Sequence, residues 1–248
     1  MIINFLGTNG WYSTYDSLTP CVLIDSDEAY IVLDAGEGIQ KLDEYITDET
    51  KPIYIFISHF HLDHIHGFHI FPKFNFKQDV TVFGKTGLKK MAEIFLNHPF
   101  TKKYSDYTFD IKFIEVDEGK HQVPFNFSCA LLPHPDPSMG FRFEIDGKIL
   151  TYCTDTGEHP NLEILAKNSD LLITECAHRP GEVDESWPHL NPETAARIAK
   201  NACAKKLALM HFDASRYTKR EDRTEAQMIA ARIFRNTVSS FDDYTIEL

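Results

Sequence analysis

The sequence predicts an α+β fold in which mixed β-sheets are covered by helices. Short apolar runs of strand length alternate with helical patterns along the whole chain of 248 residues. Two of these runs, 140–145 and 149–153, flank the turn dipeptide Asp146-Gly147, which predicts an antiparallel hairpin and argues against a purely parallel fold. No Pro-, Gly- or Ser-rich linker divides the chain, so we expect a single domain over residues 1–248.

The expected strands are short runs of apolar and β-branched residues that are bounded by turn residues. In chain order they are residues 1–6, 21–26, 29–34, 53–57, 79–83, 112–116, 127–132, 140–145, 149–153, 170–174, 206–210 and 243–247.

The expected helices have apolar residues at helical spacing or a recognisable start signal. They are residues 38–46, 86–97, 160–167, 192–202 and 224–235. Within 86–97, the apolar residues Leu88, Met91, Ala92 and Phe95 form a stripe that predicts a face turned to the core. Asn191-Pro192 suits the cap and first turn of the fourth helix. Residues 98–111 are polar, aromatic and irregular, and we expect a loop or a partly ordered lid there.

The charge balance bears on the partners of the protein. The chain has 25 Lys and Arg residues against 37 Asp and Glu residues, a formal net charge of −12. An acidic protein repels phosphate polyanions at long range, so we expect no extended nucleic-acid surface. A small phosphate ester held at a metal is still compatible with this charge, because nearby ions set the local field.

The cysteines and the N-terminus indicate a compartment. The five cysteines form no Cys-x-x-Cys pair, and most lie within apolar runs, which is typical of buried thiols in a reducing environment. The N-terminus lacks a basic segment followed by a long apolar stretch, and no run approaches 18 apolar residues. We therefore expect a cytoplasmic protein without a membrane partner.

The most informative motif is Ser-His-Phe-His-Leu-Asp-His at residues 58–64, directly after the apolar run 53–57. Imidazole and carboxylate ligands together suit divalent metals such as Zn²⁺, Mn²⁺ or Fe²⁺. His59 and His61 are two residues apart, so they point the same way on an extended segment, while Asp63 and His64 follow at a turn and can face a second point. This arrangement favours two metal ions over one.

Two metals need further ligands, and three residues are candidates. His134, Asp155 and His211 each follow an apolar run directly or within a residue or two. A layered fold can gather such strand ends at one rim of its sheets. We therefore expect His134, Asp155 and His211 to join the His59–His64 motif.

The motif His59-x-His61-x-Asp63-His64, with His134, Asp155 and His211 downstream, resembles the metallo-β-lactamase superfamily. The resemblance implies a four-layer αββα sandwich, with two mixed sheets face to face and helices outside. It implies that His59, His61 and His134 hold one metal, that Asp63, His64 and His211 hold the other, and that Asp155 bridges them. It also implies that Asp34 supports the histidine loop from behind. Zn²⁺ is the first choice for both ions, with Mn²⁺ or Fe²⁺ as alternatives, and a homodimer is compatible with the family.

Three further segments resemble the ribonuclease Z and phosphodiesterase branch of this superfamily. They are residues 5–8, residues 34–40 and the run His189-Leu190-Asn191-Pro192-Glu193. In that branch a histidine at the place of His189 contacts the scissile phosphate or protonates the leaving oxygen. The segment between His64 and His134 is too short for the long basic arm with which common ribonucleases Z grip tRNA. The resemblance therefore implies a branch member without that arm.

Aromatic residues near the motif are candidates for substrate contacts. Trp11, Tyr12 and Tyr15 lie in the loop after the first strand, which faces the active site in the superfamily. The histidine at position 178 also follows a strand end. Phe68, Phe71 and Phe74 follow the metal motif and suit either a ring-stacking role or the core equally well.

Three functional hypotheses follow. The first is a dinuclear metal-dependent phosphodiesterase for a small phosphodiester, in which a metal-bridging hydroxide attacks, Asp63 and Asp155 position it, and His189 assists the leaving group. The second keeps the site but changes the substrate to a carboxylic ester, lactone or thioester. The third is a non-catalytic, metal-binding accessory protein.

Overall fold

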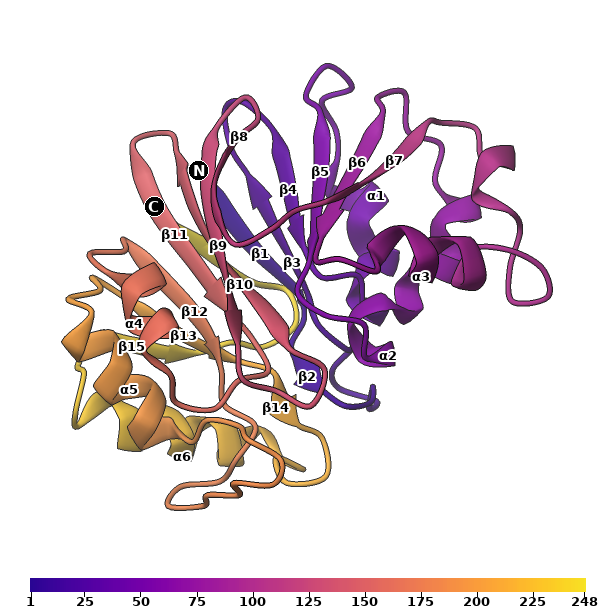
Figure 1. Ribbon diagram of the computed structural model, residues 1–248. Coiled ribbons are helices and arrows are strands. Elements are labelled where there is room, and N and C mark those ends of the chain that lie inside the picture. Colours follow the sequence, from indigo (N-terminus) through magenta and orange to yellow (C-terminus); the bar gives the residue numbers. More distant parts are fainter.

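The computed structural model describes residues 1–248 and contains two seven-stranded β-sheets packed face to face (Figure 1). Helices cover the outer face of each sheet, so the layers run helix, sheet, sheet, helix. The predicted four-layer αββα sandwich is confirmed. None of the helices combines the length and the hydrophobicity that spanning a lipid bilayer requires.

The first sheet has the order β16-β1-β3-β4-β5-β6-β7. Its strands β4 to β7 are parallel, while β16, β1, β3 and β4 pair antiparallel. The strands are β1 (Ile2–Gly7), β3 (Cys21–Asp25), β4 (Tyr30–Leu33), β5 (Ile53–Ile57), β6 (Val80–Gly84), β7 (Ile111–Glu115) and β16 (Tyr244–Glu247). The accompanying helices and 3₁₀ turns are η1 (Glu37–Lys41), α1 (Leu42–Tyr45), α2 (Leu62–Ile65), η2 (His66–Lys73), α3 (Leu88–Phe95) and η3 (Tyr104–Asp106).

The second sheet has the order β15-β13-β12-β11-β10-β9-β8. Here β11, β12, β13 and β15 are parallel, and β8 to β11 pair antiparallel. The strands are β8 (Gly119–Gln122), β9 (Asn126–Leu132), β10 (Ser138–Ile145), β11 (Lys148–Cys153), β12 (Leu171–Glu175), β13 (Leu207–Met210) and β15 (Thr237–Ser239). Helices α4 (Pro160–Ala166), α5 (Pro192–Asn201) and α6 (Arg220–Ala231) lie outside it (Figure 1).

Three apolar cores hold the layers together. The largest has 24 buried residues and lies between the two sheets, where Phe56 contacts the rings of Phe127, Phe141 and Phe143 at centroid distances of 4.8–5.3 Å. The other two cores, of 22 and 20 buried residues, lie between each sheet and its helices. The central strands β3, β4, β12 and β13 are buried on both faces and read as nearly continuous apolar runs in the sequence, whereas the edge strands β7, β8 and β16 are partly exposed.

All twelve predicted strands and four of the five predicted helices are present, with boundaries that differ by a few residues. The remaining predicted helix, 38–46, is the 3₁₀ segment η1 followed by the single turn α1. The hairpin between β10 and β11 turns at Asp146 and Gly147, whose φ values of 51° and 67° suit the tight turn predicted there. Helix α6 begins at Arg220, four residues before the predicted start at 224. Its first turn consists of charged residues and therefore shows no apolar periodicity, and the Lys219 N–H donates a hydrogen bond to the Asp222 carboxylate at the start of the helix. Residues 98–111 are largely irregular, apart from η3.

Four short strands lay outside the prediction. They include the two-residue strands β2 (Asn9–Gly10) and β14 (Phe212–Asp213), which pair with each other in parallel. Of the five cysteines, four are buried, Cys203 is exposed, and all are free thiols.

Candidate metal centre

The candidate ligands lie where strands of both sheets end at one rim of the sandwich. The segment from His59 to His64 follows β5, and helix α2 begins within it at Leu62. The other three candidates follow strands of the second sheet: His134 follows β9, Asp155 follows β11 and His211 follows β13. The seven predicted ligands therefore converge from separate parts of the chain, with each sheet contributing to the cluster.

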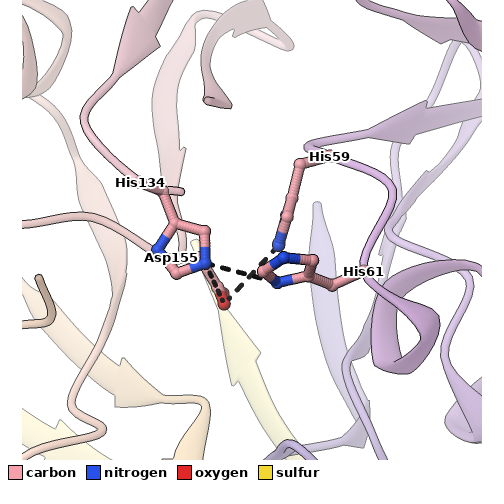
Figure 2. Close-up of side chains that lie close together, drawn as sticks. All are labelled: His59, His61, His134 and Asp155. Carbon is pink, nitrogen blue, oxygen red and sulfur yellow. Dashed lines mark hydrogen bonds and ion pairs between the residues drawn. The ribbon is translucent and has the colours of Figure 1, made fainter. Parts of the chain in front are cut away.

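A first group consists of His59, His61, His134 and Asp155, whose side chains point toward one another (Figure 2). Their potential ligand atoms all lie within 4.8 Å of one another. His134 Nε2 is 3.3 Å from His61 Nδ1, and Asp155 Oδ2 is 3.7 Å from His59 Nε2 and 3.8 Å from His134 Nε2.

A second group consists of Asp63, His64 and His211. His211 Nε2 lies 3.2 Å from His64 Nε2 and 3.3 Å from Asp63 Oδ2. The other oxygen of Asp155, Oδ1, is 3.2 Å from His64 Nε2 and 3.1 Å from His211 Nε2. The Asp155 carboxylate therefore lies between the two groups, with one oxygen toward each.

The donor set fits divalent metal ions. The buried Nε2 atom of His59 has no hydrogen-bond partner, although it points into the cluster. A buried polar atom without a partner costs about 1–3 kcal/mol, and a bound cation removes that cost. Imidazole nitrogens of His59, His134 and His211 face the oxygens of Asp155 at 3.1–3.8 Å. A cation between these lone pairs stabilises such an arrangement.

Electrostatics separates the two groups. Burial lowers the pKa of His59 well below its ordinary value and lowers the pKa of His134 to about 4, so both rings stay neutral, the form that binds metals. Burial also lowers the pKa of His64, but the carboxylates of Asp155 and Asp63 outweigh burial and raise it well above its ordinary value. The carboxylates around the second group therefore create a negative potential at His64, which favours a bound positive charge there.

Asp34 supports the histidine loop from within the protein. It is fully buried and accepts hydrogen bonds from the Ser58 N–H at 2.7 Å, the Ser58 hydroxyl at 2.9 Å, His64 Nδ1 at 2.8 Å and the Tyr152 hydroxyl at 2.7 Å. His59 Nδ1 lies 3.1 Å from the Ser58 hydroxyl. Both histidines are thereby fixed through Nδ1, which leaves Nε2 free for a ligand role.

Three of these residues have left-handed backbone conformations. Asp34, Asp155 and His211 have φ values of 58°, 47° and 51°. Side chains other than glycine rarely adopt such values, and strained residues of this kind cluster at functional sites. At His211 the fit is also close, because a Cβ on Gly10 would lie 2.5 Å from the imidazole ring.

His189 lies beside the cluster and is held by Glu175. Its potential ligand atom is within 4.8 Å of those of Asp155 and His211, and its Nδ1 is 2.8 Å from Glu175 Oε1. Burial lowers the pKa of His189, but the charge of Glu175 and its hydrogen bond outweigh burial and raise the pKa to about 9. Glu175 is fully buried and was not among the predicted residues, although a carboxylate at the end of the apolar run 170–174 is a signal that could have identified it.

A cavity of about 420 Å³ opens onto the cluster. Besides candidate ligands it is lined by His178, His189 and several residues that the sequence did not single out, among them Asp184, Trp187 and Arg216. Asp184, Trp187 and Arg216 lie in loops, where the sequence has no periodic pattern. The only signal in the sequence was the rarity of tryptophan, which applies to Trp187 alone.

The candidate aromatic residues divide into three kinds. Trp11 lines the cavity, while Tyr12 and Tyr15 are exposed and lie outside its lining. Phe68, Phe71 and Phe74 are buried in the core between the first sheet and its helices, so the core interpretation is the correct one for these three rings.

An αββα sandwich that gathers imidazoles and carboxylates beside an open cavity defines a metal-dependent hydrolase. The chain belongs to the β-lactamase superfamily: the family model described as "Beta-lactamase superfamily domain" matches residues 29–212, a range that contains all seven candidate ligands. The family resemblance of the His59–His64 motif is thus confirmed. The protein is an enzyme, and the hypothesis of a non-catalytic accessory protein is set aside.

The most similar proteins include ribonucleases. Ribonuclease Z of Pediococcus pentosaceus is 28% identical over 316 aligned positions that span 100% of both chains. YhfI of Bacillus subtilis, a metallo-β-lactamase fold protein, superposes with a TM-score of 0.82 at 21% identity, covering 100% of this chain and 98% of the other. The short form of human tRNase Z superposes with a TM-score of 0.78 at 22% identity, covering 100% and 99%.

These relatives correct one prediction from the sequence. The expectation of a small-molecule ester substrate and no extended nucleic-acid surface is wrong, because three relatives whose sequences align over 100% of both chains are named as ribonucleases. The expectation treated the net charge of −12 as a property of the whole surface. Net charge is a sum over the whole chain, however, and divalent ions bound in a cluster of this kind would dominate the field where a phosphate binds.

Proposed function

We propose that the protein is a dinuclear metal-dependent phosphodiesterase that hydrolyses a phosphodiester bond of RNA. The observation that carries this proposal is the position of Asp155, whose two oxygens face two separate groups of imidazole and carboxylate ligands. Paired metal sites of this kind suit the displacement of one oxygen of a phosphodiester by another.

In this proposal His59, His61 and His134 would hold one ion, Asp63, His64 and His211 would hold a second, and Asp155, which lies between the two groups, would serve both. Zn²⁺ is the first choice, and Mn²⁺ or Fe²⁺ fit the same nitrogen and oxygen donors. When bound, the ions supply positive charge that acidifies water and neutralises the charge developing on the phosphate.

The protein's own groups have distinct tasks. Asp63 and Asp155 position the attacking water with their carboxylate oxygens. His189 is tied through Nδ1 to Glu175, which leaves its other ring nitrogen for the substrate. The charge of Glu175 and its hydrogen bond favour the protonated form of the His189 ring, which can then donate a proton to the leaving oxygen.

RNA is proposed as the substrate class because of the relatives. Ribonuclease Z of Pediococcus pentosaceus aligns over its full length, and tRNase Z shares the fold. The alignment spans 316 positions, whereas this chain has 248 residues, so the relative has segments that this chain lacks. The short segment between His64 and His134 leaves no room for a basic arm, and we infer that the RNA is bound chiefly around the cavity.

The test combines metal content with RNA cleavage. The metal-loaded protein is incubated with a tRNA precursor that has a 3′ extension and with a single-stranded RNA, before and after removal of the metal by a chelator. We expect cleavage that a chelator abolishes and that added Zn²⁺ or Mn²⁺ restores. Metal-loaded protein that leaves both RNAs intact would contradict the proposal.

Two substitutions separate metal binding from chemistry. His61→Ala should lose metal and activity together. His189→Ala should keep its metal and lose roughly 10²- to 10⁴-fold in kcat, the range for one acid–base group. His98→Ala, at an exposed histidine far along the chain from every candidate ligand, is the matched control and should retain both.

A further inference from the structure

Both tryptophans of the chain stand at the rim of the cavity. The sequence contains only two, Trp11 and Trp187, and each lines the cavity beside the candidate metal ligands. Their side chains are large and apolar, yet Trp11 is 66% exposed and Trp187 is 48% exposed. An indole is suited to contact another flat ring through its face.

The backbone of Trp11 is held in an unusual conformation. Its φ is 72°, in the left-handed region that residues with side chains rarely adopt. Its N–H donates a hydrogen bond of 2.8 Å to Asp63 Oδ2, and its ring packs edge-on against Tyr12 at a centroid distance of 5.2 Å. The backbone of Trp11 is therefore fixed to one of the candidate ligands.

The loop that contains Trp187 is anchored on both sides of the indole. Before it, Asp184 Oδ1 accepts hydrogen bonds from the Trp187 N–H at 3.2 Å and from the Ser186 N–H at 2.9 Å. After it, Pro188 packs so closely on Gly157 that a Cβ at Gly157 would lie 2.8 Å from the proline Cβ. The Trp187 ring lies parallel to the His61 ring, with 5.9 Å between centroids and 4° between planes.

The two indoles flank different parts of the cluster. Trp11 is bonded to Asp63, which belongs to the second group of candidate ligands, whereas Trp187 lies against His61 of the first group. A phosphate bound between the two groups would have one nucleoside toward Trp11 and the other toward Trp187.

We propose that Trp11 and Trp187 form a clamp that stacks on the two nucleobases flanking the scissile phosphodiester. This proposal rests on the proposed function. Bases in a double helix are already stacked and paired, so the clamp selects RNA whose nucleotides at the cleavage site are unpaired. Because every base has a flat face, the clamp tolerates different sequences.

The first test uses variants of the metal-loaded protein and single-stranded RNA. Trp11→Ala and Trp187→Ala should each raise KM by roughly tenfold with little change in kcat, the scale of losing one base–aromatic stack. Trp11→Phe and Trp187→Phe keep a ring and should restore most of the affinity. Tyr15→Ala, a fully exposed aromatic residue outside the cavity lining, is the matched control and should leave KM unchanged.

The second test changes the RNA instead of the protein. The cleaved bond is first mapped, and the RNA is then made with abasic ribose on each side of that bond. The abasic RNA should bind the wild-type protein about as weakly as the intact RNA binds the alanine variants. Intrinsic fluorescence gives a readout independent of turnover, because Trp187→Phe leaves Trp11 as the single tryptophan, and intact RNA but not abasic RNA should quench it.

The outcomes separate the clamp from the proposed function. Suppose that the wild-type protein cleaves RNA. If both alanine variants then keep the wild-type KM, or if abasic and intact RNA bind equally well, the clamp proposal is wrong and the proposed phosphodiesterase function stands. If wild-type metal-loaded protein cleaves no RNA, the proposed function fails and the clamp fails with it.

Discussion

Asp34 shows how one buried residue sets the geometry of a whole cluster. Its Oδ2 accepts hydrogen bonds from the Ser58 hydroxyl, His64 Nδ1 and the Tyr152 hydroxyl, and its Oδ1 accepts one from the Ser58 N–H. All four partners are donors, so both oxygens must be acceptors. A carboxylate meets that demand and an amide does not, because one end of an amide is itself a donor.

Asp34→Asn should therefore weaken metal binding without changing any candidate ligand. We expect metal affinity to fall by roughly 10- to 100-fold, as for other residues that support metal-binding histidines. We also expect the free energy of unfolding of the metal-free protein to fall by about 1–3 kcal/mol, because one buried donor faces another. Titration calorimetry with Zn²⁺ and urea unfolding measure the two effects.

The control for this substitution is Asp79→Asn, which removes an exposed carboxylate that pairs with Lys112 on the surface. It should leave metal affinity unchanged and alter the unfolding free energy by less than about 1 kcal/mol. Equal metal affinity for the Asp34→Asn protein and the wild type would show that the histidine loop does not depend on Asp34.

Among individual residues, the sequence identified those whose polar side chains stand where apolar or turn residues are the rule. His59, His61 and Asp63 were identifiable because close imidazoles and carboxylates have few purposes other than metal binding. Glu175 carried a comparable signal as a carboxylate at the end of an apolar run. Trp187 was marked only by the rarity of tryptophan, because its place at the cavity depends on the turn made by Asp184 and on Pro188 packing on Gly157, contacts that no local pattern reveals.

At the scale of elements, the site depends on where parallel strands end. Strands β4 to β7 and strands β11, β12, β13 and β15 each form a parallel set, and candidate ligands follow β5, β11 and β13. The longer strands were predictable because they read either as apolar runs buried on both faces, as β12 does, or as alternating apolar and polar residues, as β9 does. Strands β2 and β14 were not, because two residues make no pattern and their pairing joins positions about two hundred residues apart.

The short pair β2–β14 is nevertheless part of the site, since it places Gly10 directly against His211. We predict that Gly10→Ala displaces the His211 ring, because a Cβ there would lie 2.5 Å from Cε1 and 2.9 Å from Nε2. Overpacking of this kind costs about 1–3 kcal/mol of stability, and we expect metal affinity to fall as well. Thermal unfolding and metal titration of the purified variant provide the measurement.

Gly84→Ala serves as the matched control for Gly10→Ala. Gly84 also ends a strand, but the nearest atom to an added Cβ is 3.3 Å away, so the neighbours need to shift little. A Gly10→Ala protein that binds metal as tightly as the Gly84→Ala protein would mean that His211 can move without loss of the site.

At the scale of the molecule, the candidate metal centre joins the two sheets. The segment from His59 to His64 comes from the first sheet, whereas His134, Asp155 and His211 come from the second. Between them, the inter-sheet core of 24 residues supplies the apolar contacts. The pattern of strands and helices predicted an α+β fold, and the resemblance of the His59–His64 motif to a known superfamily implied its four layers. The net charge misled about the substrate, because it does not report where the charges lie.

Removal of the metal should therefore destabilise the whole fold and not only the loops of the site. A ligand that binds the folded state alone contributes about 2.7 kcal/mol when its concentration is 100 times its Kd. We expect a chelator to lower the unfolding temperature measured by calorimetry, and added Zn²⁺ to restore it. In the Asp155→Asn protein, which lacks the carboxylate between the two groups, the shift should be much smaller. If metal removal leaves the unfolding temperature of the wild type unchanged, the ions are not holding the sheets together, and the seven side chains must be stabilised by their own contacts.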